Sequence, residues 1–169
     1  MKRVHVLAVL ATAAIAALPS VAGGDARSAK VIMGTDGRDV LRGGGGGDSI
    51  YGRAKDDRIR AGGGNDRVDG GSGEDVVSGG GGRDQILVRT GKDVFNGNGG
   101  NDQIFGWTGG DRLTGGSGRD RISGGKDDDV IYARDGQRDS ISCGTGNPDR
   151  VIADRADRVA GDCERVSRR

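Results

Sequence analysis

The sequence has very few aromatic, proline, cysteine and histidine residues. Only 3% of its 169 residues are aromatic, and it holds two prolines, two cysteines and one histidine. Apolar residues make up 33% of the chain, below the roughly 45–50% usual for soluble domains. A conventional globule of this length buries about two thirds of its unfolded surface, and this sequence lacks the side chains for such a core. An ordinary enzyme fold is therefore not expected.

The N-terminus is typical of an export signal. Residues 1–3 are basic at two positions, residues 4–18 form an apolar run, and residues 20–22 provide a small-x-small cleavage site. The apolar run is shorter than the about 20 residues of a membrane span. We predict a Sec-type signal peptide over residues 1–22, with cleavage after Ala22 or alternatively after Ala26. The mature protein is then secreted or periplasmic and has no membrane span.

Removing the signal peptide also removes the single histidine, His5. The mature chain then cannot form a Ser-His-Asp triad or a zinc site that contains histidine. Its formal net charge changes from +1 to −1, because Lys2 and Arg3 leave with the signal. Much of hydrolase and transition-metal chemistry is therefore excluded.

Glycine and charged residues are abundant. The chain holds 36 glycines, and 30% of its residues are charged. Glycine does not recur at every third position, which excludes collagen. This composition leaves either disorder or a repeat architecture, and a fixed period distinguishes the two.

A nine-residue repeat runs from Gly34 to Tyr132 without a gap, beginning GTDGRDVLR and GGGGGDSIY. Two further repeats, from Ala133 and Cys143, carry one extra residue each and keep Asp139 and Asp149. The eighth position is always apolar. The sixth position is always aspartate, at Asp39, Asp48, Asp57, Asp66, Asp75, Asp84, Asp93, Asp102, Asp111, Asp120 and Asp129.

Each repeat predicts a turn followed by a short strand. Glycine runs favour positive-φ turns and weaken helices and strands, while the three residues after each aspartate alternate outward, inward and outward. Two repeats make one coil, and stacked coils share a core. We predict an all-β, right-handed parallel β-roll, a two-sheet solenoid, over residues 34–152. Residues 23–33 form a linker or N-terminal cap, and residues 153–169 form a C-terminal cap and tail.

Stacking places the aspartates in two columns at the edges, with carboxylates about 5 Å apart. Such columns repel unless a cation lies between them. Oxygen ligands without imidazole or regular thiolates indicate a hard cation, and flexible multi-oxygen geometry favours Ca²⁺. Because the core is thin, we expect the binding of several Ca²⁺ ions to be coupled to folding.

The pattern GGxGxDxUx is that of a calcium-binding nonapeptide, and residues 43–50 fit it at every fixed position. From residue 34 to about residue 152 the sequence resembles the RTX (haemolysin-type) calcium-binding repeat family. The resemblance implies that Ca²⁺ lies between loops two repeats apart, held by the sixth-position carboxylates and by turn carbonyls. The implied glycine ligands are Gly44, Gly46, Gly62, Gly64, Gly80, Gly82, Gly100, Gly116 and Gly118.

The even-numbered repeats keep this motif best, so the strongest expected ligands are Asp48, Asp66, Asp84, Asp102 and Asp120. Odd-numbered repeats depart from it at Lys55, Val88, Arg89 and Asp127. We therefore expect one well-filled column of ions and one weaker column.

The two cysteines, Cys143 and Cys163, predict a disulfide in an exported protein. A reactive thiol pair or half of a metal site is the alternative, but no C-x-x-C spacing supports it.

The N-terminal signal departs from the family's usual export through a C-terminal signal.

The outward positions are rich in arginine, which we interpret as balancing the aspartate columns and not as binding nucleic acid. Leu87, Phe105 and Trp107 form an outward apolar group, which is a candidate for self-association or a surface partner.

The sequence predicts an exported, non-catalytic calcium-binding β-roll. One alternative is a hydrolase, since the resemblance implies protease and lipase relatives, with Glu74 beside Asp75 as a carboxylate pair. Another is a surface or adhesion module that binds glycans.

Overall fold

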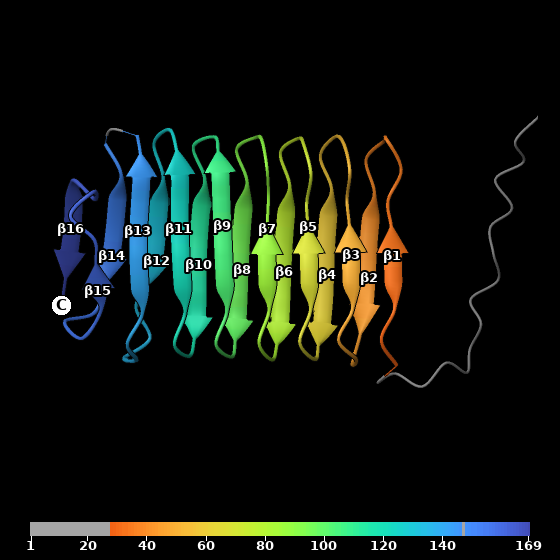
Figure 1. Ribbon diagram of the computed structural model, residues 1–169, viewed down its shortest axis with the longest axis horizontal. Coiled ribbons are helices and arrows are strands. Elements are labelled where there is room, and N and C mark those ends of the chain that lie inside the picture. Colours follow the sequence, from red (N-terminus) through yellow and green to blue (C-terminus); the bar gives the residue numbers. More distant parts are fainter. Residues whose placement is uncertain (1–27, 147) are drawn as a thin grey trace, which may run out of the picture.

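The computed structural model describes residues 28–146 and 148–169, and every regular element in this part of the chain is a β-strand. The strands form two eight-stranded parallel sheets that face each other along a straight solenoid (Figure 1). This confirms the two-sheet solenoid expected from the repeat. The expected signal peptide, residues 1–22, lies outside the described residues.

Odd-numbered strands form the first sheet: β1 (Val31–Met33), β3 (Ser49–Tyr51), β5 (Arg67–Asp69), β7 (Gln85–Leu87), β9 (Gln103–Thr108), β11 (Arg121–Lys126), β13 (Ser140–Thr145) and β15 (Arg158–Val159). Even-numbered strands form the second: β2 (Val40–Gly44), β4 (Arg58–Gly63), β6 (Val76–Gly81), β8 (Val94–Gly99), β10 (Arg112–Ser117), β12 (Val130–Ala133), β14 (Arg150–Ala153) and β16 (Arg165–Arg168).

The register between strands follows the repeat. Ile50 pairs with Val68 in the first sheet, and Leu113 pairs with Ile131 in the second. Both pairs join eighth positions two repeats apart. Each coil therefore consists of two repeats, as the sequence predicted, and equivalent residues of successive coils lie directly side by side.

Many strands are longer than the sequence predicted. We expected three-residue strands between glycine turns, but β4 runs over six residues and includes Gly62 and Gly63. The expectation that these glycines lie outside the strands is wrong. The ladder between coils uses only backbone N–H and C=O groups, so it continues through residues that have no side chain.

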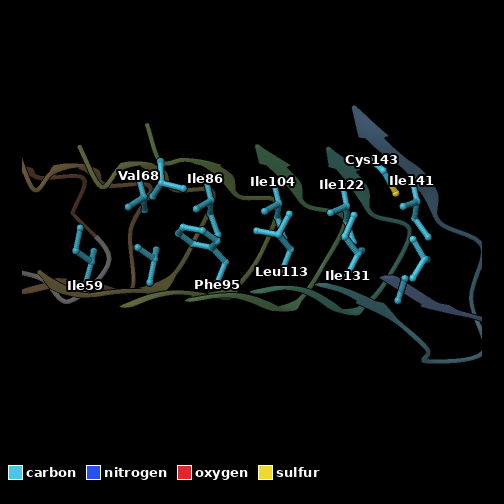
Figure 2. Close-up of a cluster of buried hydrophobic side chains, with 14 of the residues drawn as sticks. Ile59, Val68, Ile86, Phe95, Ile104, Leu113, Ile122, Ile131, Ile141 and Cys143 are labelled. Carbon is cyan, nitrogen blue, oxygen red and sulfur yellow. The ribbon is translucent and has the colours of Figure 1, made fainter. Parts of the chain in front are cut away.

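The core is a narrow double row of eighth-position side chains. Ile104 and Ile122 from the first sheet face Leu113 and Ile131 from the second (Figure 2). All four are at most 1% exposed. First-position residues such as Ala61 add to this core where they are not glycine. Each coil thus contributes only a few apolar side chains. These side chains are shielded from water only when neighbouring coils stack on both sides.

The C-terminal end is closed by further strands and a disulfide. Cys143 and Cys163 are bonded, as predicted, and the thiol alternative is therefore excluded. Beyond residues 34–152, β1, β15 and β16 also pair into the two sheets. No helix capable of crossing a membrane is found among the described residues.

Candidate metal centre

The sixth-position aspartates point into the solenoid, at the two edges where the sheets are joined. From Asp48 to Asp149 they are at most 3% exposed, although each lies in a loop, directly before a strand. Asp39, in the first coil, is only half-buried. Positions six and eight are two residues apart, so in an extended chain both side chains point to the same face. The aspartate therefore points inward, as the apolar residue does. The repeat thus brings the predicted carboxylates into two inner columns.

One oxygen of each buried carboxylate is used by the backbone. The N–H of Asp48 donates to Oδ1 of Asp66 over 2.7 Å, and the N–H of Asp66 donates to Oδ1 of Asp84 over 2.9 Å. The other column is built in the same way, for example from Asp93 to Asp111 over 2.9 Å. Each Oδ1 therefore fixes the orientation of its carboxylate relative to the preceding coil.

The other oxygen has no hydrogen-bond partner. Within the described part of the chain, buried and unpartnered Oδ2 atoms belong to Asp48, Asp57, Asp66, Asp75, Asp84, Asp93, Asp102, Asp111, Asp120, Asp129, Asp139 and Asp149. Buried polar atoms of native proteins are nearly always satisfied, so such a regular series requires an explanation. A row of electron-rich oxygens facing the interior of stacked loops offers sites for cations.

The first glycine of each loop makes room for this oxygen. A Cβ at Gly43 would collide with Oδ2 of Asp48, and a Cβ at Gly115 would collide with Oδ2 of Asp120. Glycine at the first position therefore allows the loop to lie close against the carboxylate. Larger residues at the first position occur only where the sequence departs from the motif.

Glycines at positions two and four allow the loops to stack. Gly80 and Gly82 have φ angles of +117° and +122°. A Cβ at either residue would collide with the carbonyl oxygen of Gly62 or Gly64 in the preceding coil. Carbonyls at the predicted ligand positions therefore approach the next loop closely. Five of the other predicted glycines share the positive φ or the close approach: Gly62, Gly64, Gly100, Gly116 and Gly118.

Burial raises the pKa of the column aspartates from Asp57 to Asp149. Loss of solvent is the main cause, the backbone N–H donor opposes it, and neighbouring carboxylates in the column add to it. The pKa of Asp66 rises to about 6, that of Asp102 to about 7 and that of Asp111 to about 8. Without a cation, the fold therefore makes these carboxylates harder to ionise than exposed aspartates.

The donor set fits a hard cation. The loops offer carboxylate and carbonyl oxygens, which Ca²⁺ prefers. Cys143, Asp162 and Cys163 also lie close together. The two cysteines form a disulfide, so this cluster supplies no thiolate ligand. The buried, unpartnered Oδ2 atoms and the loop carbonyls therefore form a donor set that suits Ca²⁺.

The two columns differ in their loops but not in their carboxylate ladders. Among the described residues, five that are not glycine have positive φ: Arg53, Lys55, Asn98, Trp107 and Asp127. Four of them lie in odd-numbered repeats, where the sequence departs most from the motif. The backbone of the odd column is therefore the more strained, while its aspartates remain in register.

The two columns end at Asp157 and Glu164, which the nine-residue repeat did not predict. The N–H of Asp139 donates to Oδ1 of Asp157, and the N–H of Asp149 donates to Oε2 of Glu164. Asp157 lies 18 residues after Asp139, which is the spacing of the column and could have revealed it. Glu164 lies 15 residues after Asp149, so no regular spacing marks it.

The apolar group proposed for surface contacts lies on the outer face of the first sheet. Leu87 and Phe105 pair in register and are half-buried. Trp107 is 59% exposed and follows Phe105 by two residues in β9. The structure thus brings the three side chains to one region.

Comparison with known protein families gives a match to a calcium-binding repeat, in agreement with the geometry of the two columns. The sequence model of the RTX calcium-binding nonapeptide repeat matches in four copies, over residues 31–54, 52–86, 78–113 and 108–138. The matched region contains all eleven gap-free repeats and most of the two columns. A search of curated proteins finds no match.

Proposed function

The chain belongs to the RTX calcium-binding nonapeptide repeat family, and from this premise we propose that it is an exported, non-catalytic β-roll whose folding requires Ca²⁺. Calcium binding and the β-roll follow from the family and the fold. Export, the lack of catalysis, the individual ligands and the coupling to folding are the proposal.

The single observation that carries the proposal is the series of unpartnered, buried Oδ2 atoms. Oδ2 of the column aspartates, together with carbonyl oxygens of the loop glycines, would hold the ions. When bound, Ca²⁺ supplies positive charge that offsets the repulsion between stacked carboxylates. The even column, with Asp48, Asp66, Asp84, Asp102 and Asp120, would bind most tightly because its loops keep the glycine motif.

Coupling to folding follows from where the charges lie. Thirteen aspartates are buried in the described part of the chain, and an ionised carboxylate is costly to bury unless it is paired. The unfolded chain offers no preformed site, so the free energy of ion binding contributes directly to folding. In the absence of Ca²⁺ the chain must bind protons instead or lose its ordered coils.

Export is supported by the disulfide. The Cys143–Cys163 bond persists in oxidising compartments and is rare in the cytosol. Extracellular Ca²⁺ would then drive folding after export, in the same compartment in which the disulfide forms.

The hydrolase alternative has less support. Glu74 is exposed on its loop, whereas the neighbouring Asp75 is buried inside the column. The two carboxylates therefore face different environments and do not form a common site for acid–base chemistry. Turnover of an ester or peptide substrate that is lost in Glu74→Ala, with calcium binding retained, would support the hydrolase.

The decisive experiment combines circular dichroism with calorimetry on the full mature chain at pH 7.5. In EGTA we expect a largely unordered spectrum, and on adding Ca²⁺ a β-rich spectrum with the binding of several ions. A fully folded spectrum in EGTA, with no heat on adding Ca²⁺, would contradict the coupling.

A further inference from the structure

A hollow of about 300 Å³ opens on the outer face of the first sheet, away from the calcium loops. It is lined by side chains of β9, β11, β13 and β15, including Phe105, Arg121 and Arg158. We propose that this hollow binds an acidic polysaccharide through a carboxylate or sulfate group on a sugar ring. The proposal does not depend on how many calcium sites are filled.

The two arginines are placed to share one anion. Arg121 pairs with Ser140, and Ser140 pairs with Arg158, in the same row of adjacent strands. The Cα atoms of Arg121 and Arg158 therefore lie roughly 10 Å apart, two strand spacings, with only the small hydroxyl side chain of Ser140 between them. Long arginine side chains can converge over this gap and hold a carboxylate or sulfate by paired hydrogen bonds.

Neither arginine is neutralised within the protein. None of the ion pairs that Arg38, Arg53 and Arg89 form among the described residues includes Arg121 or Arg158. None of the residues that line the hollow is acidic. Two unpaired positive charges flanking one serine attract an anion, because no internal carboxylate competes for them.

The floor and one wall of the hollow suit a sugar ring. Ser123 and Ser142 pair in register one row along and provide hydroxyl groups. Phe105 pairs with Ser123 and forms an apolar wall, and Trp107 extends the aromatic surface along β9. Pyranose rings present C–H groups to aromatic faces and hydroxyls to polar groups, and binding sites commonly combine apolar walls with a few polar groups.

The formal net charge of the chain understates how basic its surface is. Of the 25 acidic residues in the sequence, thirteen aspartates of the described region are buried in the columns, where Ca²⁺ would neutralise them. Arginines account for many outward positions on both sheets, so the calcium-loaded surface is more basic than the formal net charge of −1 of the mature chain. A polyanion would therefore be attracted before it reaches the hollow.

The test measures binding of a chondroitin sulfate hexasaccharide to the full mature chain in saturating Ca²⁺, by calorimetry at 0.15 M salt. The variant Arg121→Gln/Arg158→Gln removes the anion clamp, and Phe105→Ser removes the apolar wall. Arg58→Gln/Arg60→Gln, which removes two outward arginines of β4 on the opposite sheet, is the matched control. Thermal melting in Ca²⁺ checks that each variant is folded.

We expect saturable binding that weakens at least tenfold in Arg121→Gln/Arg158→Gln and about fivefold in Phe105→Ser, with less than a twofold change in the control. Equal weakening in the control would overturn the proposal, because binding would then be general attraction to a basic surface. Equally tight binding of a single-stranded DNA of the same charge would overturn it as well. No binding of the hexasaccharide to the folded protein would also refute the site.

Discussion

The backbone N–H of Asp84 donates to Oδ1 of Asp102 over 2.8 Å, across two stacked coils. This contact fixes one oxygen of the Asp102 carboxylate and leaves Oδ2 buried without a partner. Because the same contact repeats along both edges, the fold holds two columns of carboxylate oxygens in register. Removing the charge of one column member, with little change in shape, therefore tests calcium ligation.

Asp102→Asn should weaken calcium binding. Asparagine keeps an oxygen that accepts the N–H of Asp84 but lacks the negative charge that attracts Ca²⁺. We expect calorimetry to show the loss of at least one ion, or an affinity at least tenfold lower for the ions it contacts. Asp36→Asn is the control, because the Asp36 side chain is 89% exposed. An unchanged titration in Asp102→Asn would contradict ligation by this carboxylate.

The two columns should differ in affinity. Asp93→Asn removes a charge from the odd column, whose loops depart more from the motif. It should affect the weaker phase of the calcium titration, while Asp102→Asn affects the tighter phase. The reverse order would contradict the assignment of the strong column.

The stability of the calcium-free fold should fall as pH rises. Burial raises the pKa of Asp93 and Asp129 to about 7 and that of Asp111 to about 8, from an ordinary value of 3.8. A group whose pKa is raised by folding binds its proton more tightly in the folded state. Its contribution is fully present below about pH 4 and is lost as pH rises through 7 to 8.

Circular dichroism and thermal melting of the chain, freed of Ca²⁺ on a chelating resin, check this dependence between pH 4 and pH 8, with ordered coils expected at the acid end and a largely unordered chain at pH 7.5. In saturating Ca²⁺ the trend should reverse, because ions and protons compete for the same oxygens and ion binding improves as the carboxylates ionise. A calcium-free fold that is most stable at pH 8 would contradict the burial of uncompensated carboxylates.

Gly100→Ala should destabilise the loop stack by about 2 kcal/mol or more. Gly100 has a φ angle of +128°, and a Cβ there would collide with the carbonyl oxygen of Gly82. Both strain and collision therefore oppose any side chain. Gly81→Ala is the matched control, since a Cβ at Gly81 meets nothing within 4 Å and should change stability by no more than about 0.5 kcal/mol.

Urea unfolding in saturating Ca²⁺ measures both glycine variants. Equal stability of the two would show that loop stacking does not require glycine at the fourth position.

Trp107→Gly should be more stable than Trp107→Ala. Trp107 occupies a glycine position of the motif with a φ angle of +69°, a conformation that costs an L-residue about 1–2 kcal/mol. Alanine retains this strain, whereas glycine relieves it, so thermal melting should separate the two variants by about 1 kcal/mol. This corresponds to about 2–4 °C for a domain of this size. A more stable alanine variant would contradict the strain.

Cys143→Ala/Cys163→Ala should lower stability by about 3 kcal/mol, the value expected for closing a loop of about this length. The two cysteines are 20 residues apart in sequence, and Cys143 also belongs to the core. Cys163→Ala alone removes the same cross-link without altering the core side chain. Thermal melting that is unchanged in both variants would show that the cap is held by its strands alone.

Most of the fold can be predicted from the sequence because each repeat uses residues with a strong local preference. The sixth-position aspartate and the eighth-position apolar residue, such as Asp48 and Ile50, specify the inward face and the register. The strand lengths could not be predicted, since Gly62 and Gly63 carry no side-chain signal and join β4 only through the ladder between coils.

The site was predicted in part for the same reason. The spacing of the repeat identifies the column aspartates. It does not show that Oδ1 accepts a backbone N–H while Oδ2 has no partner, because this depends on the distance between coils. Asp157 and Glu164 lie beyond the regular repeat and join the columns only because the last strands continue the sheets.

The most direct test is a crystal structure of the mature protein grown in millimolar Ca²⁺, with anomalous difference maps to identify the ions. The account predicts peaks along both edges, about 2.3–2.6 Å from Oδ2 of column aspartates, with the even edge occupied most fully. Edges that hold only water, or arginine side chains in place of ions, would contradict it.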